Sequence, residues 1–229
     1  VGIKEKIQRI VNFEKDGKVT VSDPQRLEKE GVDLLVYNAV FNIDPNVKEL
    51  CRWIIWMTGQ SLGIIPASIQ SFYEAMGRED IKGFTVPAIN IRGLTYDTAR
   101  AAFRAANKNT NGTFIFEIAK SEIQYTYQPP AEYSTVIIAA AIKEGFRGPL
   151  FIQGDHFQLN AKKYAQDPQK EVGAIKSLID EAIEAGFYNI DIDASTLVDL
   201  SKNTLKEQQK NNYELTADLT AYIRQREPA

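Results

Sequence analysis

The feature that most constrains the fold is a rhythm that starts near Gly83. Apolar runs of strand length alternate four times with segments of helix length. We predict strands at 84–90, 113–119, 149–155 and 188–193, and helices at 96–106, 130–144, 168–185 and 211–226. The strands are continuous apolar runs, which are typical of strands covered on both faces by crossover helices. Residues 83–229 therefore predict an α/β fold with a parallel sheet built from four βα units.

Residues 1–82 lack this rhythm, and we predict that they form a mostly helical N-terminal extension. Asp44-Pro45 and Pro66-Ala67-Ser68 are typical helix starts. The run from Leu34 to Phe41 is apolar enough for a buried strand or an ordered extended segment. We therefore divide the chain into an extension, 1–82, and a four-unit domain, 83–229.

Composition excludes some classes of function. The chain has 229 residues and a net charge of −3, with 30 acidic and 27 basic side chains, so no basic excess indicates a nucleic-acid partner. Its one cysteine, Cys51, allows no intrachain disulfide, which favours a reducing, cytoplasmic setting. No apolar stretch is long enough for a membrane span, and the first residues lack the apolar core of a signal peptide.

Polar residues follow every predicted strand of the four-unit domain. In parallel α/β proteins the active site lies at the carboxyl ends of the strands, so these residues are the candidates for a site. They are Asn90 after the first strand, Glu117 in the second, Asp155 and His156 at the end of the third, and Asp191, Asp193 and Ser195 at the fourth.

His156 is the only histidine, and it directly follows Asp155. In a regular strand the two side chains point to opposite faces. A histidine near carboxylates can bind a divalent metal, although His156 could equally cap the strand by bonding a backbone carbonyl. Asp191 and Asp193 share one face, where two carboxylates repel unless a cation separates them. They predict a metal or sugar-hydroxyl site; the alternative is that one bonds a neighbouring Lys or Ser.

Glu117 lies within an otherwise apolar strand, and a buried carboxylate needs a partner. Arg92, Lys120 or Arg104 could supply it. Lys120 could also act as a Schiff-base nucleophile, although a solvated loop lysine is the simpler interpretation.

Four segments in register resemble the class II, metal-dependent fructose-bisphosphate aldolases. They are Val86-Pro87-Ala88-Ile89-Asn90, Gly154-Asp155-His156, Gly186-Phe187 and Ile192-Asp193-Ala194-Ser195. The resemblance implies the first (βα)4 half of a TIM-type barrel, and a lyase that cleaves a ketose phosphate with help from a divalent metal, zinc in that family. It implies that Asp155 is the catalytic acid/base and His156 a metal ligand. We expect Asn90, Glu117, Asp191, Asp193 and Ser195 to bind the phosphorylated sugar.

The chain also departs from that family. The family uses two further zinc histidines and glycine-rich phosphate-binding segments from later strands, and neither is present in this sequence. A closed barrel needs eight strands, and a half-barrel leaves open edges that invite pairing. We therefore expect a homo-oligomer, and we expect the chain alone to be inactive. One alternative is a non-catalytic structural subunit, or an isolated or engineered half-barrel fragment. Another is a barrel of different chemistry that uses Glu117 and Asp193 as an acid/base pair.

Overall fold

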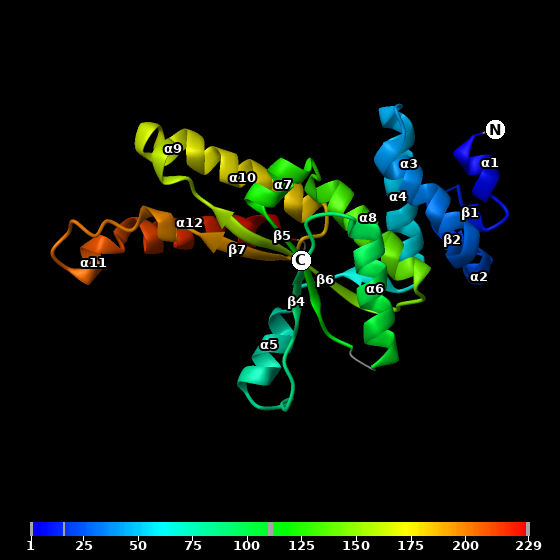
Figure 1. The fold of residues 1–229 in the computed structure, drawn as a ribbon, viewed down its shortest axis with the longest axis horizontal. Helices are drawn as coiled ribbons and strands as arrows, with labels where there is room; N and C mark the ends of the chain where they lie inside the picture. The colour runs from blue at the N-terminus through cyan, green and yellow to red at the C-terminus, as the bar shows by residue number, and fades with distance from the viewer. Residues whose placement is uncertain (1, 16, 110–111, 228–229) are drawn as a thin grey trace.

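The computed structural model describes residues 2–15, 17–109 and 112–227, and Figure 1 shows their arrangement. The strands are β1 (Val11–Phe13), β2 (Val19–Val21), β3 (Ile64–Pro66), β4 (Ala88–Asn90), β5 (Ile115–Ala119), β6 (Gly148–Gln158) and β7 (Asn189–Asp193). The longer helices are α3 (Val32–Phe41), α4 (Pro45–Ser61), α5 (Gln70–Gly77), α6 (Thr95–Lys108), α8 (Pro130–Lys143), α10 (Pro168–Glu184) and α12 (Lys210–Arg226). The short helices are α1 (Ile3–Ile7), α2 (Pro24–Arg26), α7 (Lys120–Thr126), α9 (Ala161–Gln166) and α11 (Leu205–Gln208), with a π-helical turn at Leu27–Gly31 and a 3₁₀ turn at Ser195–Leu197.

Five of the strands form one parallel sheet, which confirms the predicted α/β class. Strands β4, β5 and β6 are neighbours in that order, while β3 pairs with the first residues of β6 and β7 with its later residues. Asn189 joins β3, β6 and β7: its side chain accepts a hydrogen bond from the Ile69 amide (2.8 Å) and donates to the carbonyls of Ala67 and Ile152 (3.1 Å each).

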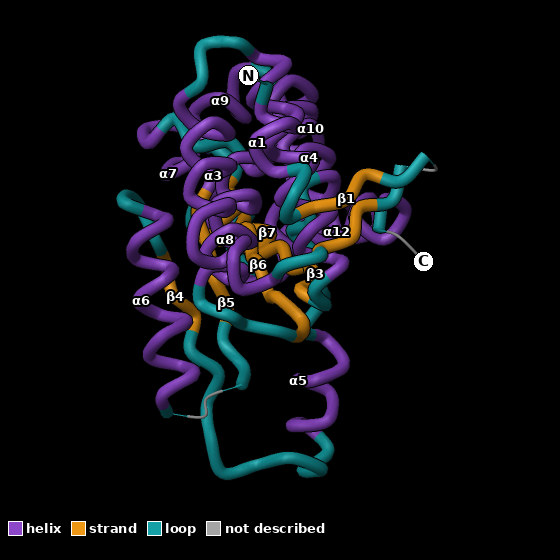
Figure 2. Tube along the Cα trace, turned by 90° about the vertical axis from the view of Figure 1, so that its right-hand side faces the viewer, coloured by secondary structure: helices purple, strands orange, loops and turns teal. Residues whose placement is uncertain are grey.

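The two faces of the sheet differ. Phe116, Ile118 and Ile152 point into the main core, which they share with residues of α6, α8 and α10. On the opposite face, here called the inner face, Ile115 and Phe151 form a small separate cluster with Ile69 and with Phe72 of α5. In both Figure 1 and Figure 2, α5 projects from the sheet on the side away from α9 and α10. The expectation of helices over the full extent of both faces is therefore wrong for the described residues, because polar side chains interrupt the apolar runs on the inner face.

The N-terminal extension packs closely on the four-unit part. Its β3 joins the sheet, and α3 and α4 share the main core with α8. On the surface, Asp33 of α3 accepts hydrogen bonds from Lys143 (2.6 Å) and from the Tyr96 hydroxyl (2.7 Å). Residues on both sides of position 82 therefore bury apolar surface in the same core.

The predicted strand or extended segment at 34–41 is wrong, because these residues belong to α3. Leu35, Val36 and Ala39 are buried, whereas Tyr37 and Phe41 are exposed. An apolar run with large side chains on the exposed side has no clear helical period, which explains the error.

Two proline-led helix starts were predicted correctly, but the start expected at Pro66 is wrong, because Pro66 ends β3 and α5 begins only at Gln70. Asp44 and Asp167 each precede a proline and accept a hydrogen bond from a backbone amide of the following helix, as the sequence led us to expect. The strand predicted at 84–90 is shorter, because only Ala88–Asn90 pairs with β5 and Pro87 lies just before the ladder. Within the described residues, no helix combines the length and apolarity that crossing a bilayer requires.

Candidate functional site

The ladder registers place the polar strand ends on one face of the sheet. Asn90 lies opposite Glu117, Glu117 opposite Gln153, and Gln153 opposite Asn189. Residues paired in a parallel ladder point to the same face, and so do residues two positions apart in one strand. The inner face therefore carries Asn90, Glu117, Asp155 and Asp191, and the structure brings together polar residues from four different strands.

An irregularity in β6 adds His156 to this group. Gly154 pairs with Ile190 and Phe157 with Ile192, so β6 has one residue more than β7 over this stretch, which is a β-bulge. At the bulge His156 adopts a left-handed backbone conformation, with φ of 43°. The predicted opposite directions of Asp155 and His156 are therefore wrong, because the bulge turns both side chains toward the same point.

Three side chains form a group that could hold a cation. His156 Nε2 lies 3.6 Å from Asp155 Oδ1, and His156 Nδ1 lies 3.5 Å from Asp191 Oδ2. One donor atom from each of Asp155, His156 and Asp191 lies within 4.8 Å of the other two. Asp155 is partly buried, whereas His156 and Asp191 are exposed to solvent.

Asp193 lies at the margin of this group. One of its oxygens is 3.5 Å from His156 Nδ1. The carboxylate is already engaged, because it accepts hydrogen bonds from the Ser195 hydroxyl (2.5 Å), the Ser195 amide (3.0 Å) and Gln158 (2.6 Å). Burial would raise the pKa of Asp193, but the hydrogen bonds from Ser195 and Gln158 outweigh burial and lower this pKa below its usual range. A bond from a neighbouring Lys or Ser was the alternative predicted for Asp191 or Asp193, and Asp193 receives such a bond from Ser195.

Asp155 has the opposite electrostatic character. Burial raises its pKa, and the negative charges of Asp191 and Glu122 add to the increase, while His156 and a hydrogen bond from Asn90 oppose it. The Asn90 amide nitrogen lies 3.4 Å from Asp155 Oδ2. The Asn90 amide oxygen is buried and has no hydrogen-bond partner among the described residues. Asp155 is thus biased toward holding a proton, beside an acceptor that is still available.

Glu117 lies lower on the inner face and accepts a hydrogen bond from Gln153 (2.9 Å). Burial raises its pKa, and the nearby charge of Asp155 raises it further. None of the three cations expected to pair with Glu117 forms an ion pair with it in the structure. They pair elsewhere: Arg92 with Glu122, Lys120 with Glu171, and Arg104 with Glu144.

Two carboxylates that support the site were not identified from the sequence as supporting residues. Glu122 accepts hydrogen bonds from Arg92 and from the Ala119 amide (2.8 Å). Burial alone would raise the pKa of Glu122, but the bonds from Arg92, Ala119 and Asn90 lower it below its usual range. From the third position of α7, Glu122 bonds the N-cap amide, which is one half of a capping box, but the N-cap residue is Ala119, so the sequence lacks the Ser or Thr that would have revealed the pattern.

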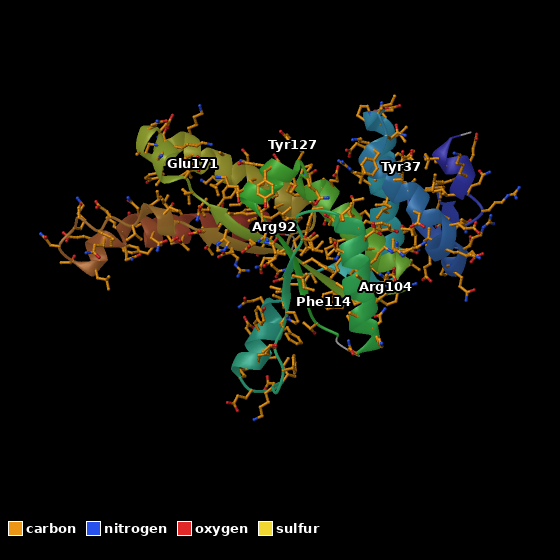
Figure 3. All side chains as sticks on the ribbon, in the orientation of Figure 1. Tyr37, Arg92, Arg104, Phe114, Tyr127 and Glu171 are labelled. Atoms are coloured by element: carbon orange, nitrogen blue, oxygen red, sulfur yellow. The ribbon has the colours of Figure 1, made fainter. Side chains whose placement is uncertain are left out.

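The second carboxylate, Glu171 in the first turn of α10, accepts hydrogen bonds from Lys120 (3.1 Å) and from the Asn160 amide (2.8 Å). Lys120 also donates to the Gln158 carbonyl (2.9 Å) at the end of β6. Lys120 therefore links the ends of β5 and β6 to α10, rather than standing free as a nucleophile. Figure 3 labels Glu171, on α10, and Arg92, which follows β4.

Comparisons with known proteins assign no family to the chain. No family model matches its sequence. A search of curated proteins also found no match.

Proposed function

We propose that this protein carries part of the active site of a metal-assisted lyase that cleaves a ketose phosphate, as the resemblance to class II aldolases implies. The observation that carries the proposal is the group of Asp155, His156 and Asp191 at the strand ends, with their donor atoms within 4.8 Å of one another. In this proposal the parallel sheet is half of a TIM-type barrel, and the inner face is the half of the barrel interior that holds the site.

The donor set fits a divalent cation. An imidazole nitrogen and a carboxylate oxygen are ligands that Zn²⁺ accepts, and a cation held by two protein side chains keeps coordination positions for substrate. The same donors also suit Mn²⁺, so the choice of zinc rests on the resemblance alone. His156 and Asp191 are the ligands we propose. The Asp193 carboxylate, already bonded by Ser195, stabilises the imidazole from the side.

Asp155 is the residue we propose for proton transfer. A carboxyl whose pKa is raised by burial can hold a proton and release it, which is what an acid/base in carbon–carbon bond cleavage must do. When bound, the metal would polarise the substrate carbonyl and stabilise the negative charge that cleavage leaves on that oxygen. Asn90 orients Asp155 through its amide nitrogen, and its unpaired oxygen can accept a hydrogen bond from a sugar hydroxyl.

Glu117 extends the polar surface below Asp155. Its hydrogen bond to Gln153 leaves carboxylate oxygen available for a second hydroxyl of the sugar. Asp193 and Ser195 offer a further hydroxyl contact on the other side of His156. A polyhydroxylated substrate could therefore lie along the inner face with its carbonyl toward the cation.

The experiment combines metal binding with turnover. We expect isothermal titration with ZnCl₂ or MnCl₂ to show one site in the full chain. Asp191→Asn should weaken cation binding, whereas Asp155→Asn should retain the cation. Asp199→Asn is the matched control, because Asp199 accepts the same pair of hydrogen bonds from Ser201 that Asp193 accepts from Ser195, but lies outside the site.

Turnover is measured with fructose 1,6-bisphosphate as the probe, by detecting the triose phosphates released. Aldol cleavage that is unchanged in Asp155→Ala would refute the assignment of Asp155. If the chain binds no cation and releases no product, the non-catalytic alternative is correct, and the inner face then has a structural role. That alternative is favoured by the single histidine, since the aldolase family supplies two more.

A further inference from the structure

Five large apolar side chains are exposed on the segments around one hollow of the molecule. Tyr37, Phe41 and Ile43 lie in and just after α3, Leu94 precedes α6, and Tyr127 follows α7. We call these five residues the α3–α7 patch. Tyr37, Phe41 and Leu94 line a hollow of about 680 Å³. Figure 3 shows Tyr37 and Tyr127 on the same side of the molecule.

Two residues of the α3–α7 patch are held in strained backbone. Leu94 and Tyr127 have φ of 48° and 53°, in the left-handed region, and their side chains are 82% and 88% exposed. This conformation costs an L-residue roughly 1–2 kcal/mol, and exposing a large apolar side chain adds to the cost. Strain of this kind persists mainly where the strained residue has a function.

We propose that the α3–α7 patch is an interface between two copies of this chain related by a two-fold axis. With each large apolar side chain offering about 150–200 Å², the patch presents roughly 600 Å² per copy, close to the ~800 Å² that each partner contributes to a stable interface. The lining of the hollow also contains both charge signs, including Arg92 and Asp97. These charges are already paired within one copy, Arg92 with Glu122 and Asp97 with Arg100, so a two-fold interface, which pairs one surface with itself, meets no net repulsion there.

The polar side chains around the hollow are already bonded within the chain, which leaves its apolar residues as the groups that a partner would cover. Among the described residues, the buried side-chain atoms without a hydrogen-bond partner are Arg52 Nε and Asn90 Oδ1, and neither residue lines the hollow. Thr95 and Tyr96, which do line it, are bonded to Gln128 and Asp33. Leu94 and Tyr127 project so far into solvent that they suit insertion into a partner's surface.

This interface differs from the homo-oligomer expected from the sequence, which would join two sheets through their open edges. The α3–α7 patch lies on α3 and on the segments that follow β4 and α7, so a dimer formed there does not pair strand edges. The inference does not rest on the proposed lyase function, because it uses no residue of the cation group.

The test is the oligomeric state of the full chain, measured by sedimentation equilibrium over a range of concentrations. We expect a dimer with a dissociation constant in the micromolar range or tighter. The double variant Leu94→Asn/Tyr127→Asn should weaken dimerisation at least about tenfold. It should not lower the melting temperature of the monomer, because asparagine tolerates left-handed backbone. The matched control is Leu200→Asn/Leu205→Asn, which removes leucines that are 78% and 73% exposed outside the patch and should leave the dimer unchanged.

Three results would overturn the inference. The first is a wild-type chain that stays monomeric at the highest concentration measured. The second is a dimer that persists undiminished in Leu94→Asn/Tyr127→Asn, which would place the contact elsewhere, such as at the sheet edges. The third is a monomeric wild type that binds 8-anilinonaphthalene-1-sulfonate at one saturable site lost in Phe41→Ser, which would make the hollow a small-molecule site. Thermal unfolding of each variant confirms that it is folded.

Discussion

Replacing Gly154 with alanine tests whether the packing of β6 sets the geometry of the candidate site. A Cβ atom at Gly154 would lie 2.5 and 2.6 Å from two ring carbons of Phe157. Side chains essentially never approach this closely, and Phe157 is fully buried, so its ring cannot turn into solvent. The bulge spans Gly154 to Phe157 and contains Asp155 and His156. The substitution must therefore move either the ring or the bulge.

The expected cost follows from overpacking. Inserting a methyl group into a filled core typically costs about 1–3 kcal/mol. For a chain of this size each kcal/mol lowers the melting temperature by roughly 2–4 °C, so Gly154→Ala should melt roughly 3–10 °C below the wild type. The control is Gly173→Ala in α10, where an added Cβ meets no atom within 4 Å and alanine should stabilise the helix by about 0.5–1 kcal/mol.

Urea unfolding followed by the fluorescence of Trp53 and Trp56 measures the free-energy change, and titration with MnCl₂ measures the cation affinity of the folded variant. Because the bulge carries His156, we expect Gly154→Ala to lower that affinity even at temperatures where it is fully folded. Full stability in Gly154→Ala would refute the packing argument. A destabilised variant with wild-type cation affinity would show that the positions of Asp155 and His156 do not depend on Phe157.

Two further predictions concern buried ionisable groups. Lys120→Met leaves the buried Glu171 carboxylate with only the Asn160 amide as partner, and we expect a loss of about 3 kcal/mol at neutral pH in urea unfolding. Burial would raise the pKa of Glu171, but the bonds from Asn160 and Lys120 lower this pKa in the folded protein. The ionised Glu171 therefore contributes to the free energy of unfolding above its unfolded pKa, and this contribution is lost as pH falls below about 4.5. Unfolding free energy should therefore fall less steeply with acid in Lys120→Met than in the wild type, and equal slopes would contradict this. Burial raises the pKa of the Cys51 thiol to about 11, so a thiol reagent at neutral pH should modify it only after denaturation; rapid labelling of the native chain would show that α4 opens.

The sequence was sufficient for elements whose signals are local. The helices starting at Asp44-Pro45 and Asp167-Pro168 were predictable, because the proline and the capping aspartate act on their own helix. Strand β3 was missed, since Ile64–Pro66 is three residues long and its pairing with Gly148–Leu150 depends on a segment more than eighty residues away. No short-range pattern can report such a pairing.

The same difference between local and long-range signals decides which parts of the candidate site could be predicted. The apolar run of each strand was enough to predict which polar residues lie at its carboxyl end, and the registers place four of them on one face. The partners of Glu117, Arg92 and Lys120 could not be predicted, because each depends on how far one strand end lies from the next helix. The glycine at position 154 was visible in the sequence, but only the position of the Phe157 ring explains why a side chain is excluded there.

The strained residues connect the two proposals. Described non-glycine residues with clearly positive φ include Leu94, Tyr127 and His156. Leu94 ends the connection from β4 to α6, Tyr127 caps the end of α7, which follows β5, and His156 lies at the bulge in the last part of β6, so each lies near or beyond the carboxyl end of a strand. Backbone strain at these positions must be offset by packing in the free protein or by a partner in the bound one. The proposed partner of His156 is a cation, and the proposed partner of Leu94 and Tyr127 is a second copy of the chain. Each of these strained residues therefore lies where the fold presents a side chain outward instead of packing it into the core.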